Sequence, residues 1–200
     1  MKIENNVLVE VTEEDIEKGK LYIPEGVTTI EGNIFRGFEN LREIFLPKSI
    51  REIKDDGFGN AYNLEYVHGM ENVTTLGIYA FSCCRSLKEI TIPNGIEILP
   101  KGTFYNCAEL KTVRIPSSVK EIGPRAFIRC KSLCEITIPK SVTEIGIGCF
   151  DETLQLPKIK YEAGLDDNVV SYLKDNYKKK IVPENSILDS LLGKIGSIGK

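Results

Sequence analysis

A single spacing of 23 residues dominates this chain of 200 residues. Six of its eight phenylalanines follow one another at that step, and they are Phe35, Phe58, Phe81, Phe104, Phe127 and Phe150. A second column has only one substitution and contains Pro24, Pro47, Met70, Pro93, Pro116 and Pro139. Four further columns of leucine, isoleucine or valine keep the same register. A fixed period of ~20–50 residues is typical of proteins whose repeats stack. The period therefore predicts stacked coils that share one continuous core.

The repeating unit is clearest in two copies. They read Leu-Lys-Glu-Ile-Thr-Ile-Pro from Leu87 to Pro93 and Leu-Cys-Glu-Ile-Thr-Ile-Pro from Leu133 to Pro139. The Ile-x-Ile alternation predicts a short strand with one buried face, and proline ends the strand because it has no N–H to donate. We expect a turn, a second extended piece such as 119–122, and then one helical or 3₁₀ turn that carries the phenylalanine.

The pattern Leu-x-x-Ile-x-Ile, followed by a turn and by Ala-Phe-x-x-Cys, closely resembles the BspA-type leucine-rich repeat family over residues 21–161. The resemblance implies a leucine-rich repeat solenoid, right-handed and curved. It implies a parallel β-sheet on the concave face and short 3₁₀ or turn segments on the outside. It also implies roles in adhesion and protein–protein interaction, often at a bacterial cell surface or in host contact.

The segments that flank the repeats differ from them and are expected to cover the ends of the solenoid. We assign residues 1–20 to an N-terminal cap, 21–161 to the solenoid and 162–183 to a C-terminal capping helix. Asp166 and Asp167 precede apolar residues at helical spacing, as at the start of an amphipathic helix. Residues 184–200 form an amphipathic or flexible tail, for which docking on the solenoid, disorder and partner binding all stay open.

Composition and charge argue against several functions. The net charge of −3 lacks the basic excess that nucleic acid binding needs. No run approaches the ~18 apolar residues of a membrane span, and the first residues do not read as a signal peptide. We therefore expect no nucleic acid partner and no membrane insertion. The location is cytoplasmic by default, with a cell-surface or secreted protein as the alternative that the resemblance implies. The oligomeric state stays open, with a monomer as one option.

The six cysteines and the one histidine offer little for catalysis. Cys84, Cys107 and Cys130 each follow a phenylalanine by three residues, which predicts buried thiols and not disulfides. No Cys-x-x-Cys spacing occurs, so we expect no metal site and no cofactor. Cys134 is the cysteine that we expect to reach solvent, but its candidate base, His68, lies three repeats away. We predict no enzymatic activity, and a cysteine-dependent enzyme is the alternative from another class.

The third coil departs from the pattern. Gly69 stands in an apolar column and Met70 takes the place of proline. Since glycine inside a strand pattern often marks a bulge, we expect a local irregularity here.

Two columns of side chains are expected on the concave face, because the residues on either side of the first isoleucine point away from the core. The first column contains Lys20, Glu43, Tyr66, Glu89, Thr112, Glu135 and Lys158. The second contains Tyr22, Phe45, His68, Thr91, Arg114, Thr137 and Lys160. The first three coils thus gather aromatic side chains, the type that dominates binding hot spots.

We expect this concave patch to bind a protein or peptide ligand. The candidate binding residues are Tyr22, Phe45, Tyr66, His68, Glu43 and Arg114. Cross-strand aromatic packing, partly covered by the N-terminal cap, is the alternative interpretation of the same residues. The predicted function is a non-catalytic interaction module in adhesion or host contact, with an intracellular scaffold or a translocated effector as the alternative.

Overall fold

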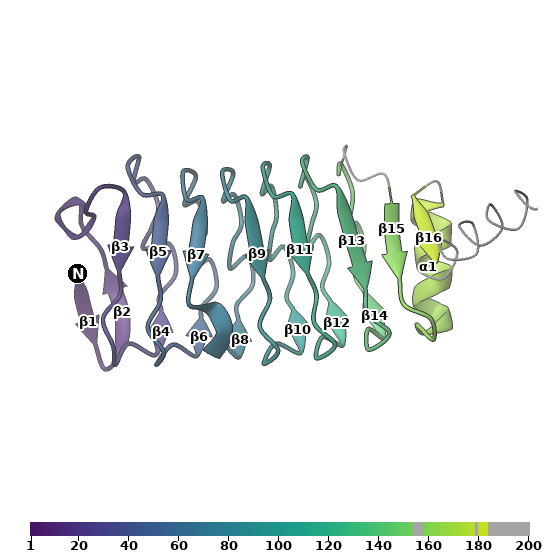
Figure 1. Cartoon of the computed structure of the whole chain (residues 1–200), viewed down its shortest axis with the longest axis horizontal. Coiled ribbons are helices and arrows are strands. Elements are labelled where there is room, and N and C mark those ends of the chain that lie inside the picture. Colours follow the sequence, from purple (N-terminus) through teal and green to yellow (C-terminus); the bar gives the residue numbers. More distant parts are fainter. Residues whose placement is uncertain (154–157, 179, 184–200) are drawn as a thin grey trace, which may run out of the picture.

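The computed structural model is a solenoid with a row of parallel strands along one side (Figure 1), and it describes residues 1–153, 158–178 and 180–183. In spatial order the row contains β3 (Lys20–Tyr22), β5 (Glu43–Phe45), β7 (Tyr66–His68), β9 (Glu89–Thr91), β11 (Thr112–Arg114), β13 (Glu135–Ile138), β15 (Lys158–Tyr161) and β16 (Ile181–Pro183). The paired strands up to β15 match residues 23 positions apart, as Lys20 with Glu43 and Thr112 with Glu135. The predicted leucine-rich repeat solenoid with a parallel sheet is confirmed. We call the solvent side of this row the open face.

A second row of strands comes from the extended pieces that follow the proline turns. It contains β2 (Val7–Glu10), β4 (Thr29–Ile30), β6 (Glu52–Ile53), β8 (Thr75–Leu76), β10 (Ile98–Leu99), β12 (Glu121–Ile122) and β14 (Glu144–Ile145). The hairpin strand β1 (Lys2–Glu4) pairs antiparallel with β2. From β4 onward, each strand of this second row has two residues. The core lies between the two parallel rows.

Both rows are interrupted between the third and fourth coils. Within the described residues, β7 is not hydrogen-bonded to β9, and β8 is not hydrogen-bonded to β10. Gly69 has a φ of +85°, and a short 3₁₀ helix, η2 (Met70–Asn72), takes the place of the proline turn. The expected irregularity of the third coil is therefore a break in both rows and not a bulge.

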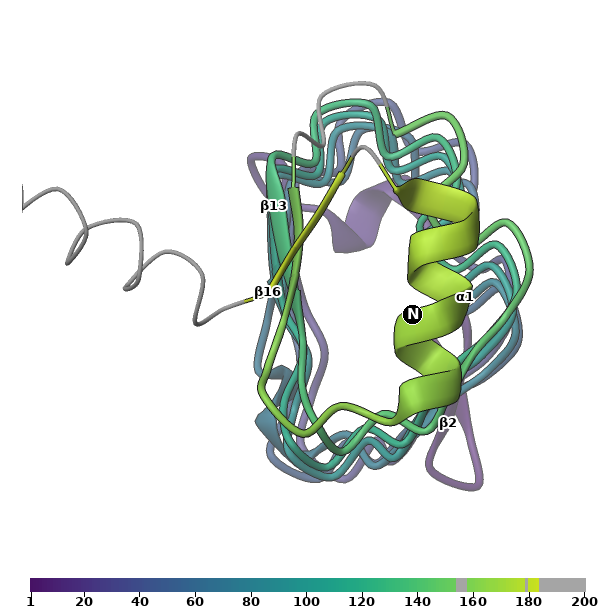
Figure 2. The ribbon, with the colours of Figure 1, turned by 90° about the vertical axis from the view of Figure 1, so that its right-hand side faces the viewer.

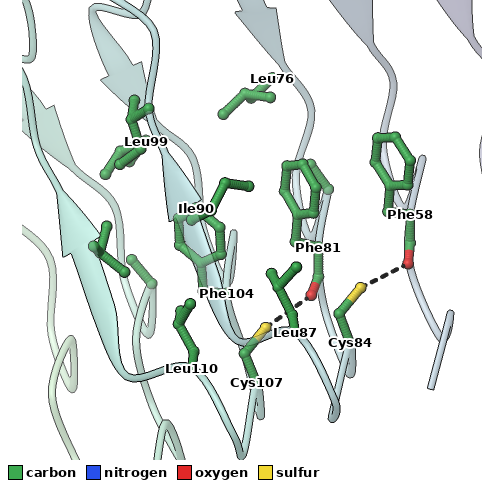
Figure 3. Close-up of a cluster of buried hydrophobic side chains, with 14 of the residues drawn as sticks. Phe58, Leu76, Phe81, Cys84, Leu87, Ile90, Leu99, Phe104, Cys107 and Leu110 are labelled. Carbon is green, nitrogen blue, oxygen red and sulfur yellow. Dashed lines mark hydrogen bonds between the residues drawn. The ribbon is translucent and has the colours of Figure 1, made fainter. Parts of the chain in front are cut away.

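The phenylalanine column forms the centre of the core. All six rings are buried, and consecutive rings stack with centroids 4.8–5.6 Å apart. The thiols of Cys84 and Cys107 donate to the carbonyl oxygens of Phe58 and Phe81 in the preceding coils, each with an Sγ–O distance of 3.1 Å (Figure 3). The predicted burial of Cys84, Cys107 and Cys130 is confirmed, because none of the three side chains is exposed. Each thiol also hydrogen-bonds one coil to the preceding coil.

Each phenylalanine lies in a series of tight turns and not in a regular 3₁₀ turn. The residue two positions before each ring has a positive φ of 54–69°, and the column contains Asn33, Asp56, Tyr79, Gly102, Arg125 and Gly148. Residues other than glycine and asparagine rarely adopt this left-handed backbone conformation. The sequence did not predict this column, because tertiary packing and not local preference sets the backbone at Tyr79 and Arg125.

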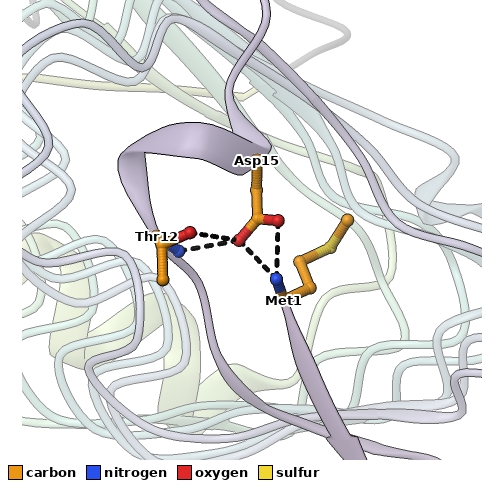
Figure 4. A network of polar contacts seen from close by, with 3 residues as sticks. All are labelled: Met1, Thr12 and Asp15. Atoms are coloured by element: carbon orange, nitrogen blue, oxygen red, sulfur yellow. Dashed lines mark hydrogen bonds and ion pairs between the residues drawn. The ribbon is translucent and has the colours of Figure 1, made fainter.

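The N-terminal segment folds against the first coil. The 3₁₀ helix η1 (Glu13–Asp15) begins after Thr12, whose side chain and backbone N–H both bond the Asp15 carboxylate (Figure 4). The amino group of Met1 lies 2.5 Å from the same carboxylate. This ammonium group is the main reason why the pKa of Asp15 lies below its ordinary value.

A helix, α1 (Asp167–Tyr177), lies across the C-terminal end of the solenoid (Figure 2). Asp166 caps it by accepting the N–H of Asn168 at 2.8 Å, and Leu173 and Tyr177 are buried. The same segment also contains β16, which pairs parallel with β15 and which the sequence did not predict. The tail at 184–200 lies outside the described residues.

Tyr177 closes the phenylalanine column. Its ring packs edge-on against Phe150 with centroids 5.6 Å apart, and its hydroxyl accepts the backbone N–H of Phe150 at 3.2 Å. In the preceding coil, the N–H of Phe127 donates to the carbonyl of Cys149 instead. The Tyr177 hydroxyl thus replaces the carbonyl that another coil would supply.

Candidate interaction surface

The open face carries the two predicted columns of side chains in register. Tyr22 pairs with Phe45 and Phe45 with His68, so that strand pairing places these three side chains in one line. The rings of Tyr22 and Phe45 have centroids 4.5 Å apart and an interplanar angle of 10°. Those of Phe45 and His68 lie 4.4 Å apart at 17°. We call these three side chains the aromatic stack.

Tyr66 extends the aromatic stack sideways. It lies on the same strand as His68, with ring centroids 6.2 Å apart. The Lys88 ammonium group lies 5.5 Å from the Tyr66 centroid, and that of Lys20 lies 5.8 Å from the Phe45 centroid. Cations at this range are attracted to ring faces. Tyr22 nevertheless remains 56% exposed, so the N-terminal segment leaves this ring open to solvent.

The carboxylate of Glu43 contacts two polar side chains beside the aromatic stack. Glu43 accepts from His68 Nε2 at 3.0 Å and pairs with Lys20 Nζ at 3.2 Å. Because an ionised carboxylate only accepts, Nε2 of His68 carries the proton. His68 and Lys20 together hold the pKa of Glu43 below its ordinary value. The imidazole is therefore oriented by Glu43 as well as by stacking on Phe45.

Arg114, the sixth predicted residue, is not part of the aromatic stack. It lies on β11, two strands beyond His68, and borders a hollow of about 600 Å³ that Tyr66 and His68 also line. The hollow lies where the strand row is interrupted, and Gly69 and Asn94 form part of its rim. The sequence did not predict the hollow, although Gly69 and Met70 marked the irregular coil.

The open face of the later coils is polar and charged. Glu89, Thr112 and Glu135 follow one another in the first column, where the first three coils have Lys20, Glu43 and Tyr66. Lys160 pairs with Glu135 at 2.8 Å. The two columns of this region carry charges of both signs and no ring.

Four of the six cysteines are buried. All six are free thiols; Cys134 is exposed, as expected, and Cys83 is half-buried. Burial raises the pKa of Cys130 to about 12, and it also raises the pKa values of Cys84, Cys107 and Cys149.

Neither a metal site nor a membrane span is found in the part of the chain that the structure describes. No group of three or more histidine, cysteine, aspartate or glutamate side chains is placed to hold a metal ion there. Among the same residues, no helix is both long and apolar enough to cross a bilayer.

A comparison with known families identifies a match. The description of that family is "BspA type Leucine rich repeat region", and six copies match over residues 14–134 and 57–172. A comparison with curated proteins found no match.

Several solved structures share the fold. A leucine rich cell surface protein from Faecalibacterium prausnitzii A2-165 is 24% identical, with a TM-score of 0.56 over 76% of this chain and 52% of that one. The pneumococcal vaccine antigen PcpA is 24% identical, with a TM-score of 0.67 over 80% of this chain and 44% of that one. A leucine rich repeat protein from T. pallidum is 19% identical, with a TM-score of 0.53 over 88% and 84% of the two chains. The chain spans about half the length of the first two structures.

Proposed function

Because the chain belongs to the BspA-type leucine-rich repeat family, we propose that it is a non-catalytic module that binds a protein or peptide ligand on its open face. The observation that carries the proposal is the aromatic stack. Tyr22 and His68 are exposed and Phe45 is half-buried on a rigid sheet, where their fixed positions cost little conformational entropy on binding. Tyr66, Glu43 and Arg114 complete the proposed binding residues.

The biological setting that we propose is adhesion or contact with a host. The Faecalibacterium relative in fold is described as a cell surface protein, which supports an extracellular ligand here. An intracellular scaffold or a translocated effector would use the same face. Fractionation of native cells distinguishes the two settings: recovery of the protein with surface proteins supports adhesion, and recovery with cytoplasmic proteins overturns it.

A double substitution tests the binding face. Phe45→Ala with Tyr66→Ala removes two of its rings, and we expect the captured partner to be lost in a pull-down with the full chain. The matched control is Glu135→Ala with Thr137→Ala, which changes the equivalent columns of the later coils. Circular dichroism checks that both variants fold. Undiminished capture by the first variant would contradict the proposal.

Thiol reactivity tests the alternative of a cysteine-dependent enzyme. We expect iodoacetamide to modify Cys134 first and Cys83 next, because the other four thiols are buried. A catalytic cysteine has a depressed pKa and reacts even in mild acid. Rapid modification of one cysteine at about pH 5, read by mass spectrometry, would favour the enzyme and weaken the interaction module.

A further inference from the structure

The hollow between β7 and β9 lies at the end of the aromatic stack. Lys88 N still donates to Glu65 O at 3.2 Å just before the two strands. Beyond that bond, the described part of the chain has no ladder between β7 and β9, so one edge of each strand lacks a strand partner. The break therefore leaves both a hollow and unpaired backbone edges between β7 and β9, two strands that lie near the middle of the molecule in Figure 1.

The aromatic stack stops at this space because its next member is small. Column two continues from His68 to Thr91, an exposed threonine that lines the hollow. One face of the His68 ring covers Phe45. Its other face is directed along the column, toward the position above Thr91, where no ring follows. The stack is thus open at one end.

Arg114 stands on the far side of the same position. It follows Thr91 in the column by one strand and is exposed. Across the described residues its guanidinium makes no ion pair, side-chain hydrogen bond or ring contact, whereas Lys20 and Lys88 each pair with a glutamate. Arg114 lies one paired-strand spacing of ~4.8 Å beyond Thr91, and the unpaired step from β9 to β7 adds to its separation from His68, which leaves room for one ring between the two side chains.

We propose that this hollow receives an aromatic side chain from an extended segment of the partner protein. The ring enters above Thr91 and stacks between the imidazole of His68 and the guanidinium of Arg114. A cation over a ring face is favourable, and the free edges of β7 and β9 provide backbone groups for the flanking peptide. This inference rests on the proposed function and specifies the chemistry of the ligand.

The test uses N-acetyl-L-tyrosinamide as a probe and the full ¹⁵N-labelled chain. We expect saturable shifts of the amide signals of His68, Thr91 and Arg114, and no such shifts with N-acetyl-L-leucinamide. Thr91→Tyr fills the position with a ring of the protein itself, so probe binding should be lost. Thr143→Tyr adds the same ring at an exposed position just before β14 in the other row, and this variant should bind the probe as the parent does.

Two further variants test the proposed ring site even if Thr91→Tyr does not fold. Arg114→Gln should weaken probe binding by about two- to fivefold, as expected for one exposed cation–π contact, and His68→Ala should weaken it further. An absence of shifts in the parent, equal binding of the leucine probe, or undiminished binding by Arg114→Gln and His68→Ala would each overturn the proposal. Such a failure leaves the interaction module intact, because that function is tested separately by partner capture with the Phe45 and Tyr66 double variant.

Discussion

The first three coils and the later coils share one interior and differ in what they show to solvent. Phe58 in the early part and Phe104 in the later part are both fully buried in the same stacked column. On the open face, Phe45 is replaced at the equivalent position by Thr137. The change occurs where the strand rows break, beside Gly69.

The comparison distinguishes positions that determine how the coils pack from positions that can determine which ligand binds. Inward columns must repeat because each coil packs on the next. Outward columns are free of that constraint, and the rings gathered in only one region are the side chains that we propose to bind a ligand. The following predictions test this separation.

The largest effect is expected in the shared interior. Phe58→Ala and Phe104→Ala each remove a buried ring, and each should lower the free energy of unfolding by about 3–5 kcal/mol. The two values should agree, because the column is the same in both regions. Urea unfolding followed by circular dichroism measures them. A near-zero value for either variant would break the comparison.

The break between the regions is the next target. A Cβ at Gly69 would lie 2.5 Å from the carbonyl oxygen of Leu46, and φ is +85°. Gly69→Ala should therefore lower the free energy of unfolding by about 3 kcal/mol, since strain and a steric clash add. Gly26→Ala is the control, because its φ is +93° and nothing lies within 4 Å of its Cβ. There we expect a loss of about 1 kcal/mol.

The C-terminal end of the interior column supplies a smaller effect. Tyr177→Phe leaves the N–H of Phe150 without its partner at 3.2 Å. The expected loss in free energy of unfolding is about 1–2 kcal/mol. Tyr22→Phe, which removes a hydroxyl from the open face, should change stability by less than about 0.5 kcal/mol. Thermal unfolding measures both variants. Equal losses of stability would contradict the expected difference between the interior tyrosine and the exposed one.

The smallest effect concerns the left-handed column. Arg125 has a φ of +58°, where the first coil has Asn33. Asparagine tolerates this conformation better than arginine, so Arg125→Asn should raise the free energy of unfolding by about 0.5 kcal/mol. Lys120→Asn, at an exposed position without a positive φ, is the control and should bring no gain. A lower melting temperature for Arg125→Asn would contradict the prediction.

The periodic columns made most of the fold predictable. The phenylalanine column, the buried cysteines and the order of side chains on the open face follow from a repeat whose inward positions must match between coils. The break at Gly69, the strand β16 and the turn at Arg125 were not predicted, because each depends on contacts between distant segments. For the same reason, the sequence grouped Arg114 with the rings, whereas the structure places it across the hollow from His68.

The 23-residue register has a consequence for how such a chain can change its length. Strand pairs join residues one repeat apart, as Glu121 with Glu144. Removal of residues 105–127 would connect Phe104 to Ile128 and leave every remaining side chain in its own column. Removal of a single residue within a strand would instead turn the inward side chains that follow it in that strand toward solvent. A change in length by whole coils therefore keeps the pattern of inward and outward side chains.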